Sequence, residues 1–264
     1  MATITLDGTA KEAPETMTVL QVARLAGVDI PTLCHHESLG PYGACRLCVV
    51  EAESPTLRRS LITACTLQVA DGLSVVTNSA AVQRARKIVL ELLLARSPNS
   101  RPLRALAKQH GVEGSRFGAG LDDDDLCVRC GLCVRACTDQ IGAAAISFAG
   151  RGQKREVSTE FGHLSRLCIG CGTCAAVCPT GAIQIEDNNG ERSILLRGRA
   201  FARLALIRCS SCGISFAAER HLDKVSHRLP ESPQAEMLSL CPACSRQHYA
   251  AAMASEIPQA GKGF

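Results

Sequence analysis

Large aromatic side chains are scarce in this sequence. Its 264 residues include no tryptophan, six phenylalanines and two tyrosines. Aromatic residues contribute much of the buried apolar area of ordinary cores, and much of the 46% hydrophobic content here is alanine and cysteine. We therefore expect several small units, each stabilised by bound metal, in place of one large core.

Long apolar runs and a strong charge imbalance are also missing. No stretch approaches the ~18 apolar residues of a membrane span, and the longest run, Ile88 to Ala95, is interrupted by Glu91. Met1 to Gly8 predicts a strand and a turn, and not a basic, apolar leader. A net charge of +4 is too small to indicate nucleic-acid binding. We expect a cytoplasmic protein with no direct membrane insertion and no nucleic-acid partner.

Motifs for nucleotide binding and for catalysis are absent as well. No Walker loop or G-x-G-x-x-G fingerprint occurs, and Gly118-Ala-Gly120 precedes acidic residues where a helix would be needed. No Ser/His/Asp set or pair of carboxylates stands out. We assign no catalytic residue, and we place flavin, nicotinamide and catalytic-metal sites on other chains.

Cysteine, in contrast, is abundant. A cytosolic chain with sixteen thiols binds metal more often than it forms disulfides. Eight cysteines form two runs with the same two-, two- and three-residue gaps: Cys127, Cys130, Cys133 and Cys137, then Cys168, Cys171, Cys174 and Cys178, with Pro179 following. Zinc sites use paired ligands, whereas these gaps direct three thiolates to one iron–sulfur cube and the fourth to the other cube.

The two runs predict two [4Fe–4S] clusters. Cluster I is assigned to Cys127, Cys130, Cys133 and Cys178, and cluster II to Cys168, Cys171, Cys174 and Cys137. On these motifs the region resembles the bacterial eight-cysteine ferredoxin family. It departs from the family pattern at Thr138, where proline is usual, and in a longer insert, Asp139 to Leu167, which is a candidate partner contact.

A third cysteine set lies near the N-terminus: Cys34, Cys45, Cys48 and Cys65. Strand composition is found at residues 3–6, 48–52, 61–65 and 73–77. Thr18 and Gln21 form a capping box for a helix through Ala26 that Gly27 ends. Strands around one helix, with three of the cysteines in a Gly-rich loop, describe a β-grasp ferredoxin that holds a [2Fe–2S] cluster.

The gap of ten residues between Cys34 and Cys45 exceeds the plant-type spacing. It resembles the N-terminal domain of the large iron–sulfur subunit of respiratory NADH dehydrogenase, and the diaphorase iron–sulfur subunit of NAD-linked hydrogenases. Four small residues of this loop should let backbone N–H groups approach the bridging sulfurs of the cluster: Gly40, Pro41, Gly43 and Ala44. Four buried free thiols are the alternative to a cluster here.

An amphipathic helix is predicted over residues 79–95. In the resembling families this helix leads to a His/Cys-ligated [4Fe–4S] cluster, but Arg96 to Gly120 contains no cysteine, so that cluster is not expected here. This basic segment is expected to be a solvated linker. The alternative is a docking face for an acidic partner.

The last four cysteines are Cys209, Cys212, Cys241 and Cys244. Two C-x2-C pairs that hold one tetrahedral metal are typical of a zinc ribbon, and a mononuclear iron with the same thiolates is the alternative. The tail resembles the C-terminal extension of the ferredoxin-type subunit of formate hydrogenlyase. No thiol is left over for catalysis.

The predicted fold class is α+β: an N-terminal β-grasp [2Fe–2S] ferredoxin, a bacterial-type 2[4Fe–4S] ferredoxin and a C-terminal zinc-ribbon-like module. The expected segments are the [2Fe–2S] domain, a helix with a basic linker, the 2[4Fe–4S] domain, the four-cysteine zinc-ribbon-like module and a flexible tail, at residues 1–80, 81–120, 121–190, 191–250 and 251–264.

The resemblances imply an electron-transfer subunit in a hetero-oligomeric oxidoreductase. Electrons would pass between a flavin/NAD(P)H-handling subunit and a hydrogenase or formate dehydrogenase subunit. The expected cofactors are one [2Fe–2S], two [4Fe–4S] and one zinc or mononuclear iron. A redox-sensing iron–sulfur regulator with a zinc-ribbon interaction module is the alternative.

Overall fold

The structure is a computed structural model that describes residues 1–118, 125–229 and 237–256. It consists of two compact units. The first contains residues 1–142, 148–157 and 173–183, and the second contains residues 143–147, 158–172 and those from 184 onward. The predicted 2[4Fe–4S] segment, residues 121–190, therefore contributes to both units.

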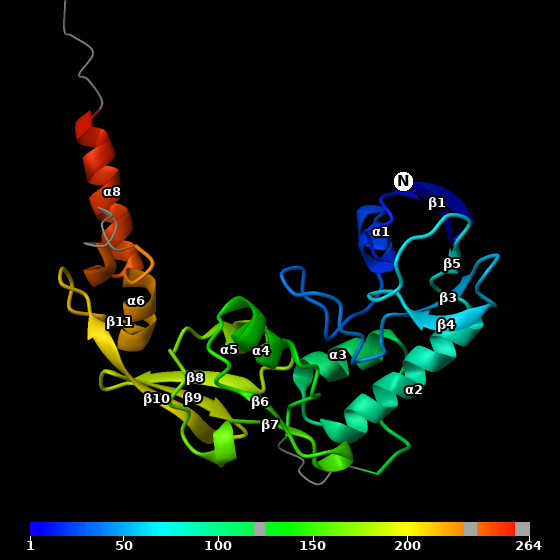
Figure 1. Cartoon of the computed structure of the whole chain (residues 1–264). Coiled ribbons are helices and arrows are strands. Elements are labelled where there is room, and N and C mark those ends of the chain that lie inside the picture. Colours follow the sequence, from blue (N-terminus) through cyan, green and yellow to red (C-terminus); the bar gives the residue numbers. More distant parts are fainter. Residues whose placement is uncertain (119–124, 230–236, 257–264) are drawn as a thin grey trace, which may run out of the picture. The chain divides into compact units, whose positions relative to one another are not determined.

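A five-stranded mixed sheet forms the N-terminal part of the first unit (Figure 1). Its strands are β1 (Ala2–Leu6), β2 (Thr9–Ala13), β3 (Val49–Glu53), β4 (Ser60–Thr63) and β5 (Ser74–Val76), in the order β2-β1-β5-β3-β4. β1 and β5 are parallel, and the other neighbouring strands are antiparallel. The four strands predicted from composition are all present.

Helix α1 (Val19–Leu25) packs on this sheet. The capping box is formed, since the Thr18 backbone N–H donates to Gln21 Oε1 at 2.8 Å and the Gln21 N–H donates to Thr18 Oγ1 at 3.4 Å. Gly27 follows the helix with a φ of 74°. The buried face of α1 shares one core with the sheet and with Cys48 and Cys65, so the fold fixes these two thiols at the strand ends.

The basic segment after the sheet is not a solvated linker, contrary to expectation. Helix α2 (Ala80–Arg96) is followed by a second helix, α3 (Arg101–Gln109), and the two pack together (Figure 1). Leu103 and Ala107 of α3 are fully buried. Their spacing of four residues and Pro102 at the helix start were sequence signals for this helix.

Two of the cysteine sets share the core that α2 and α3 cover. Beside the helix residues, this core holds Leu33, Cys34, Leu39, Cys45, Leu47, Cys130, Leu132 and Ala136. The last three precede or belong to α4 (Leu132–Arg135) and the π-helical turn η1 (Ala136–Gln140). The shared core fixes the loop that carries Cys34 and Cys45 against the loop that carries Cys130.

The insert between the two cysteine runs forms short elements: β6 (Ser147–Ala149), η2 (Gly152–Lys154), β7 (Glu156–Ser158) and η3 (Glu160–Gly162), of which β6 and β7 pair. Helix α5 (Thr173–Ala176) follows in the first unit.

The second unit is built on an antiparallel sheet of β8 (Ile183–Asn188), β9 (Glu191–Leu196), β10 (Arg199–Arg208) and β11 (Ser215–Ala218). It also contains α6 (Glu219–Ser226), η4 (Met237–Ser239) and α8 (Pro242–Glu256). The tail predicted to be flexible from residue 251 is therefore helical through Glu256, and the remainder of that prediction, 257–264, lies outside the described residues.

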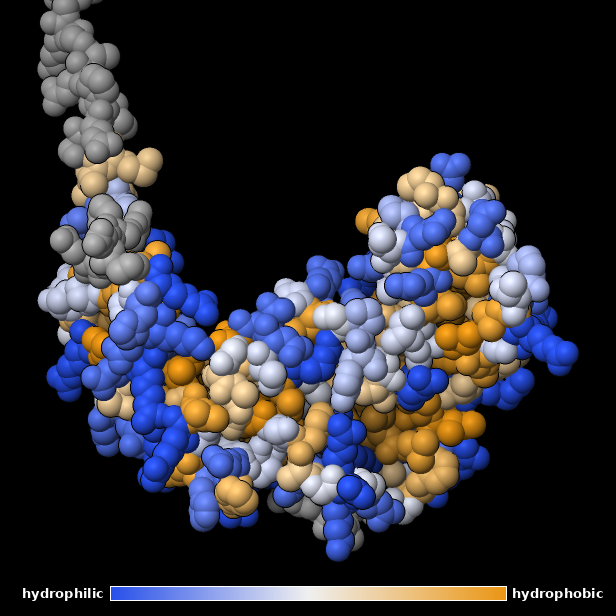
Figure 2. Space-filling view, in the orientation of Figure 1, coloured by the Kyte–Doolittle hydropathy of each residue, from blue (hydrophilic) through white to orange (hydrophobic). Residues whose placement is uncertain are grey.

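The exposed face of α2 carries apolar side chains, and Figure 2 shows them as a hydrophobic patch over this helix. Ile88 is 43% exposed and Leu92 is 51% exposed. Within the described ranges, no helix combines the length and the apolar character needed to cross a membrane.

Candidate iron–sulfur and metal sites

All four N-terminal cysteines are buried in the first unit. Cys48 directly precedes β3, and Cys65 lies just after β4. The backbone N–H of Cys45 donates to Cys34 Sγ at 3.3 Å, and the N–H of Ala44 also approaches this sulfur. Backbone donors of this loop thus reach a cysteine sulfur, whereas the predicted contacts with the bridging sulfurs of a cluster stay a prediction.

These thiols also hydrogen-bond to one another. Hydrogen bonds from Cys45 and Cys65 lower the pKa of Cys34, and a hydrogen bond from Cys65 lowers the pKa of Cys48 to about 7. The same contacts raise the pKa values of Cys45 and Cys65. Four buried sulfurs linked by a chain of hydrogen bonds fit a four-thiolate group, whose binding would release the remaining protons.

The four thiols predicted to hold cluster I all lie in the first unit. Cys127, Cys130 and Cys133 are buried, and Cys178 is half-buried. Burial, together with the negative charges of Cys178 and Cys127, raises the pKa of Cys130 to about 12. In this buried environment an isolated thiolate is unfavourable, whereas a metal-bound thiolate is favoured because the metal neutralises its charge.

Asp125 supports this set. Its Oδ1 accepts the N–H of Cys127 at 2.9 Å, and its Oδ2 lies 3.4 Å from Arg96 Nη2. The Asp125 side chain is buried. It therefore fixes the start of the Cys127 loop against the C-terminal end of α2. The acidic residues before it, 122–124, lie outside the described residues.

The predicted ligands of cluster II are divided between the two units. Cys137 and Cys174 belong to the first, and Cys168 and Cys171 belong to the second. Their assignment to one cluster stays a prediction from the spacing.

The Cys168–Cys171 loop is anchored on the sheet of the second unit. Arg192 Nη1 donates to the Gly170 carbonyl at 2.9 Å, and the same guanidinium makes a two-point ion pair with Asp187 at 2.7 and 2.8 Å. Gly170 has a φ of 74°, and a Cβ there would lie 2.6 Å from the Ala218 Cβ. Only glycine fits at this close approach.

Tyr42 joins the first two cysteine sets within the first unit. Its ring lies under the Arg135 guanidinium, 4.9 Å from centroid to Cζ. The Arg135 side chain also donates to the Gly40 carbonyl, and Gln140 Nε2 donates to the Ser38 carbonyl at 2.7 Å. The sequence analysis missed this contact, because no local pattern pairs two loops so far apart along the chain.

The last four cysteines converge in the second unit. The Sγ atoms of Cys209, Cys212, Cys241 and Cys244 lie within 4.8 Å of one another. The Cys241 N–H donates to Cys209 Sγ at 3.2 Å and lowers the pKa of that thiol to about 6. Four converging thiols with a backbone N–H to sulfur fit one tetrahedral metal ion. Which metal it takes stays a prediction.

Family models match both ferredoxin regions. The model described as a 2Fe-2S iron-sulfur cluster binding domain matches residues 1–80, and the model described as a 4Fe-4S dicluster domain matches residues 126–182 and 167–218. The predicted [2Fe–2S] and [4Fe–4S] ferredoxin folds are thereby confirmed. The zinc-ribbon-like module stays a prediction.

Known proteins share this combination of regions. The NADP-reducing hydrogenase subunit HndD of Solidesulfovibrio fructosivorans is 35% identical over 212 residues, which cover 69% of this chain and 36% of the relative. The NADH-ubiquinone oxidoreductase 75 kDa subunit of Reclinomonas americana is 30% identical over 205 residues, or 69% and 29% of the two chains. The chain thus spans about a third of the length of these relatives.

A solved structure is similar over most of its own length. It is the crystal structure of an NAD+-reducing [NiFe]-hydrogenase in the H2-reduced state, with a TM-score of 0.58 and 33% sequence identity. The match covers 68% of this chain and 85% of that chain.

Proposed function

The chain belongs to the family of iron–sulfur subunits of NAD(P)H-linked hydrogenases and NADH dehydrogenases, and we propose that it relays electrons within a multisubunit oxidoreductase. In this role it binds clusters and accepts and donates single electrons, and its partner subunits carry out the substrate chemistry. The kinship with such subunits favours this relay over a redox-sensing regulator.

The observation that carries the proposal is the shared core of the first unit. Cys34 and Cys45 pack in the same hydrophobic cluster as Cys130, and the negative charge of Cys34 acts on Cys130. Groups held by these two sets would therefore be neighbours. Electron transfer needs short distances between carriers, which this arrangement supports without the additional His/Cys-ligated cluster that the sequence lacks.

Three cysteine sets would hold iron–sulfur groups in this proposal: Cys34, Cys45, Cys48 and Cys65 a [2Fe–2S] cluster; Cys127, Cys130, Cys133 and Cys178 one [4Fe–4S] cluster; Cys168, Cys171, Cys174 and Cys137 another. When bound, these groups supply one-electron redox chemistry. The role of the chain is to shield these groups from water and, for the two sets that share the core of the first unit, to fix their separation. The four-cysteine site of the second unit would hold zinc, or one iron, as a structural ion. Its ligands are Cys209, Cys212, Cys241 and Cys244.

The relatives support a proposal for the partners. We propose a flavin/NAD(P)H-handling subunit beside the N-terminal domain and a hydrogenase subunit that exchanges electrons with the [4Fe–4S] region. The relatives named for NADP-reducing and NAD+-reducing hydrogenases support this choice. A formate dehydrogenase partner rests only on the resemblance of the C-terminal tail, and it is the second choice.

Cys45→Ser in the intact complex tests the relay. The change should abolish the electron paramagnetic resonance (EPR) signal of the [2Fe–2S] cluster and the NAD(P)H-linked turnover, because a thiolate ligand is lost. Dye-linked activity of the catalytic subunit should persist. Cys209→Ser is the control, since it removes a thiol from the tail site and should leave the [2Fe–2S] signal. Full NAD(P)H-linked turnover in Cys45→Ser would overturn the proposal.

A further inference from the structure

Arg86 is a charged side chain buried within the first unit. It projects from α2 and is only 4% exposed. Its Nη2 donates to the backbone carbonyl of Val49 at 2.9 Å, and its Nε has no hydrogen-bond partner. Burying a guanidinium is costly unless its charge is paired and hydrogen-bonded, so the groups around Arg86 matter.

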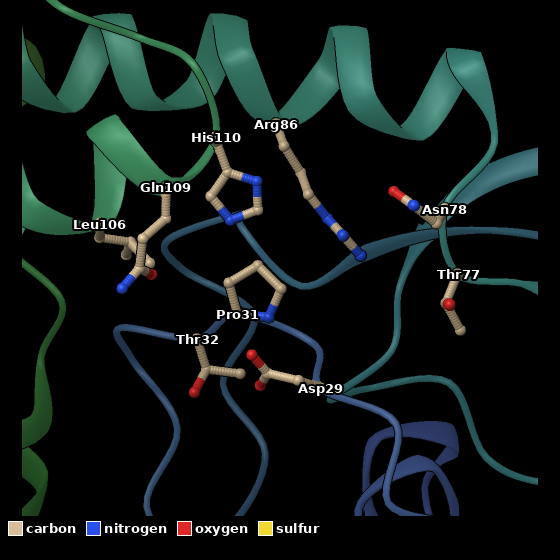
Figure 3. A pocket seen from close by; sticks show the side chains of 9 residues that line it. All are labelled: Asp29, Pro31, Thr32, Thr77, Asn78, Arg86, Leu106, Gln109 and His110. Atoms are coloured by element: carbon tan, nitrogen blue, oxygen red, sulfur yellow. The ribbon is translucent and has the colours of Figure 1, made fainter.

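The guanidinium faces a cavity of about 530 Å³. Figure 3 shows Arg86 and His110 projecting into this space, with Asp29 on the opposite side. None of the ion pairs found among the described residues includes Arg86. The negative charges of Asp29 and Asp7 act on Arg86 without an ion-pair contact among the described residues.

Arg86 binds the backbone carbonyl of Val49, and Cys48 immediately precedes Val49 in the chain. Burial lowers the pKa of Arg86, and the negative charge of Cys48 opposes this shift. An arginine stays protonated in proteins despite such shifts. A permanent positive charge therefore lies behind one thiolate of the N-terminal set.

We propose that Arg86 is a positioning residue that raises the reduction potential of the [2Fe–2S] site by placing a fixed positive charge behind Cys48. The inference rests on the proposed function, which assigns a cluster to this thiol set. Reduction adds one negative charge to the cluster. A nearby cation in a poorly screened interior stabilises the reduced state more than the oxidised one.

The test is an EPR-monitored redox titration of the full chain carrying its clusters. Arg86→Gln should shift the [2Fe–2S] midpoint potential to a more negative value, and Arg86→Lys should restore part of the shift. Arg84→Gln is the matched control, since it removes the same charge from an exposed position of the same helix. Its potential should equal that of the unchanged protein.

A second variant covers the case in which Arg86→Gln does not fold. Asp29→Asn removes the negative charge across the cavity and should move the potential in the positive direction. Equal potentials in all variants, with the [2Fe–2S] signal present, would overturn this inference alone. Absence of the signal from the unchanged protein would overturn the proposed function, and this inference with it.

Discussion

Tyr42, in the loop between Cys34 and Cys45, contacts the loop that carries Cys130 and Cys133. Arg155 Nη2 donates to its hydroxyl at 3.4 Å, and Arg135 covers its ring. Gly131, between Cys130 and Cys133, lies against the same ring, since a Cβ there would be 3.0 Å from Tyr42 Cε1. These contacts add to the shared core in holding the two loops together, so we expect Tyr42 to contribute to the separation of the carriers.

Tyr42→Leu should slow electron transfer between the [2Fe–2S] cluster and cluster I while both remain bound. The loss of the cation–π contact should also lower the free energy of unfolding by ~0.5–2 kcal/mol. Freeze-quench EPR after rapid reduction measures the rate. Tyr249→Leu, the same change at the other tyrosine, which is 45% exposed in α8, should have no effect. Unchanged rates in Tyr42→Leu would show that the contact is not needed.

At the scale of elements, α3 shows why composition misled the sequence analysis. Arg101, Arg104 and Lys108 make the segment look like a solvated linker, but they lie on the exposed side. Leu103 and Ala107 occupy the opposite side and are fully buried in the core that contains Cys34 and Cys130. Helix α3, which carries no predicted metal ligand, thus completes the hydrophobic core around two candidate cluster sites.

Leu103→Ala should destabilise the first unit by ~2–5 kcal/mol, because it leaves a cavity in this core. Denaturant unfolding of the cluster-loaded protein, followed by visible absorption and circular dichroism, measures the change. Leu92→Ala is the matched control on the exposed face of α2 and should change stability by less than ~0.5 kcal/mol. If the two variants unfolded alike, the packing of α3 would not contribute to stability.

At the scale of the molecule, the thiols and the scarcity of aromatic residues predict that bound metal is part of the folded state. The cores are small, and cysteines belong to both core clusters of the first unit. Small units bury only a limited apolar area, so apolar burial alone stabilises them weakly. Metal–thiolate bonds therefore contribute to the folding free energy itself.

Metal analysis of the anaerobically purified chain should find about ten iron atoms and about one zinc ion. Cys209→Ser should remove the zinc and leave the iron content unchanged, because that thiol belongs to the four-cysteine site of the second unit. About eleven iron atoms without zinc would assign a mononuclear iron to this site instead. Colourless protein without acid-labile sulfide would contradict the cluster assignments altogether.

The sequence by itself determined the cysteine sets, the strands of the N-terminal sheet, the capping box of α1 and the predicted cluster types. The strands and the capping box are local properties, because side-chain periodicity and capping are set within a few residues, and the cysteine spacings can be counted directly along the chain. The tertiary structure decided the burial of α3, the cavity beside Arg86 and the contact of Gly40 with Arg135, which are 95 residues apart. Such features depend on which segments pack together, and no short stretch of sequence encodes that choice.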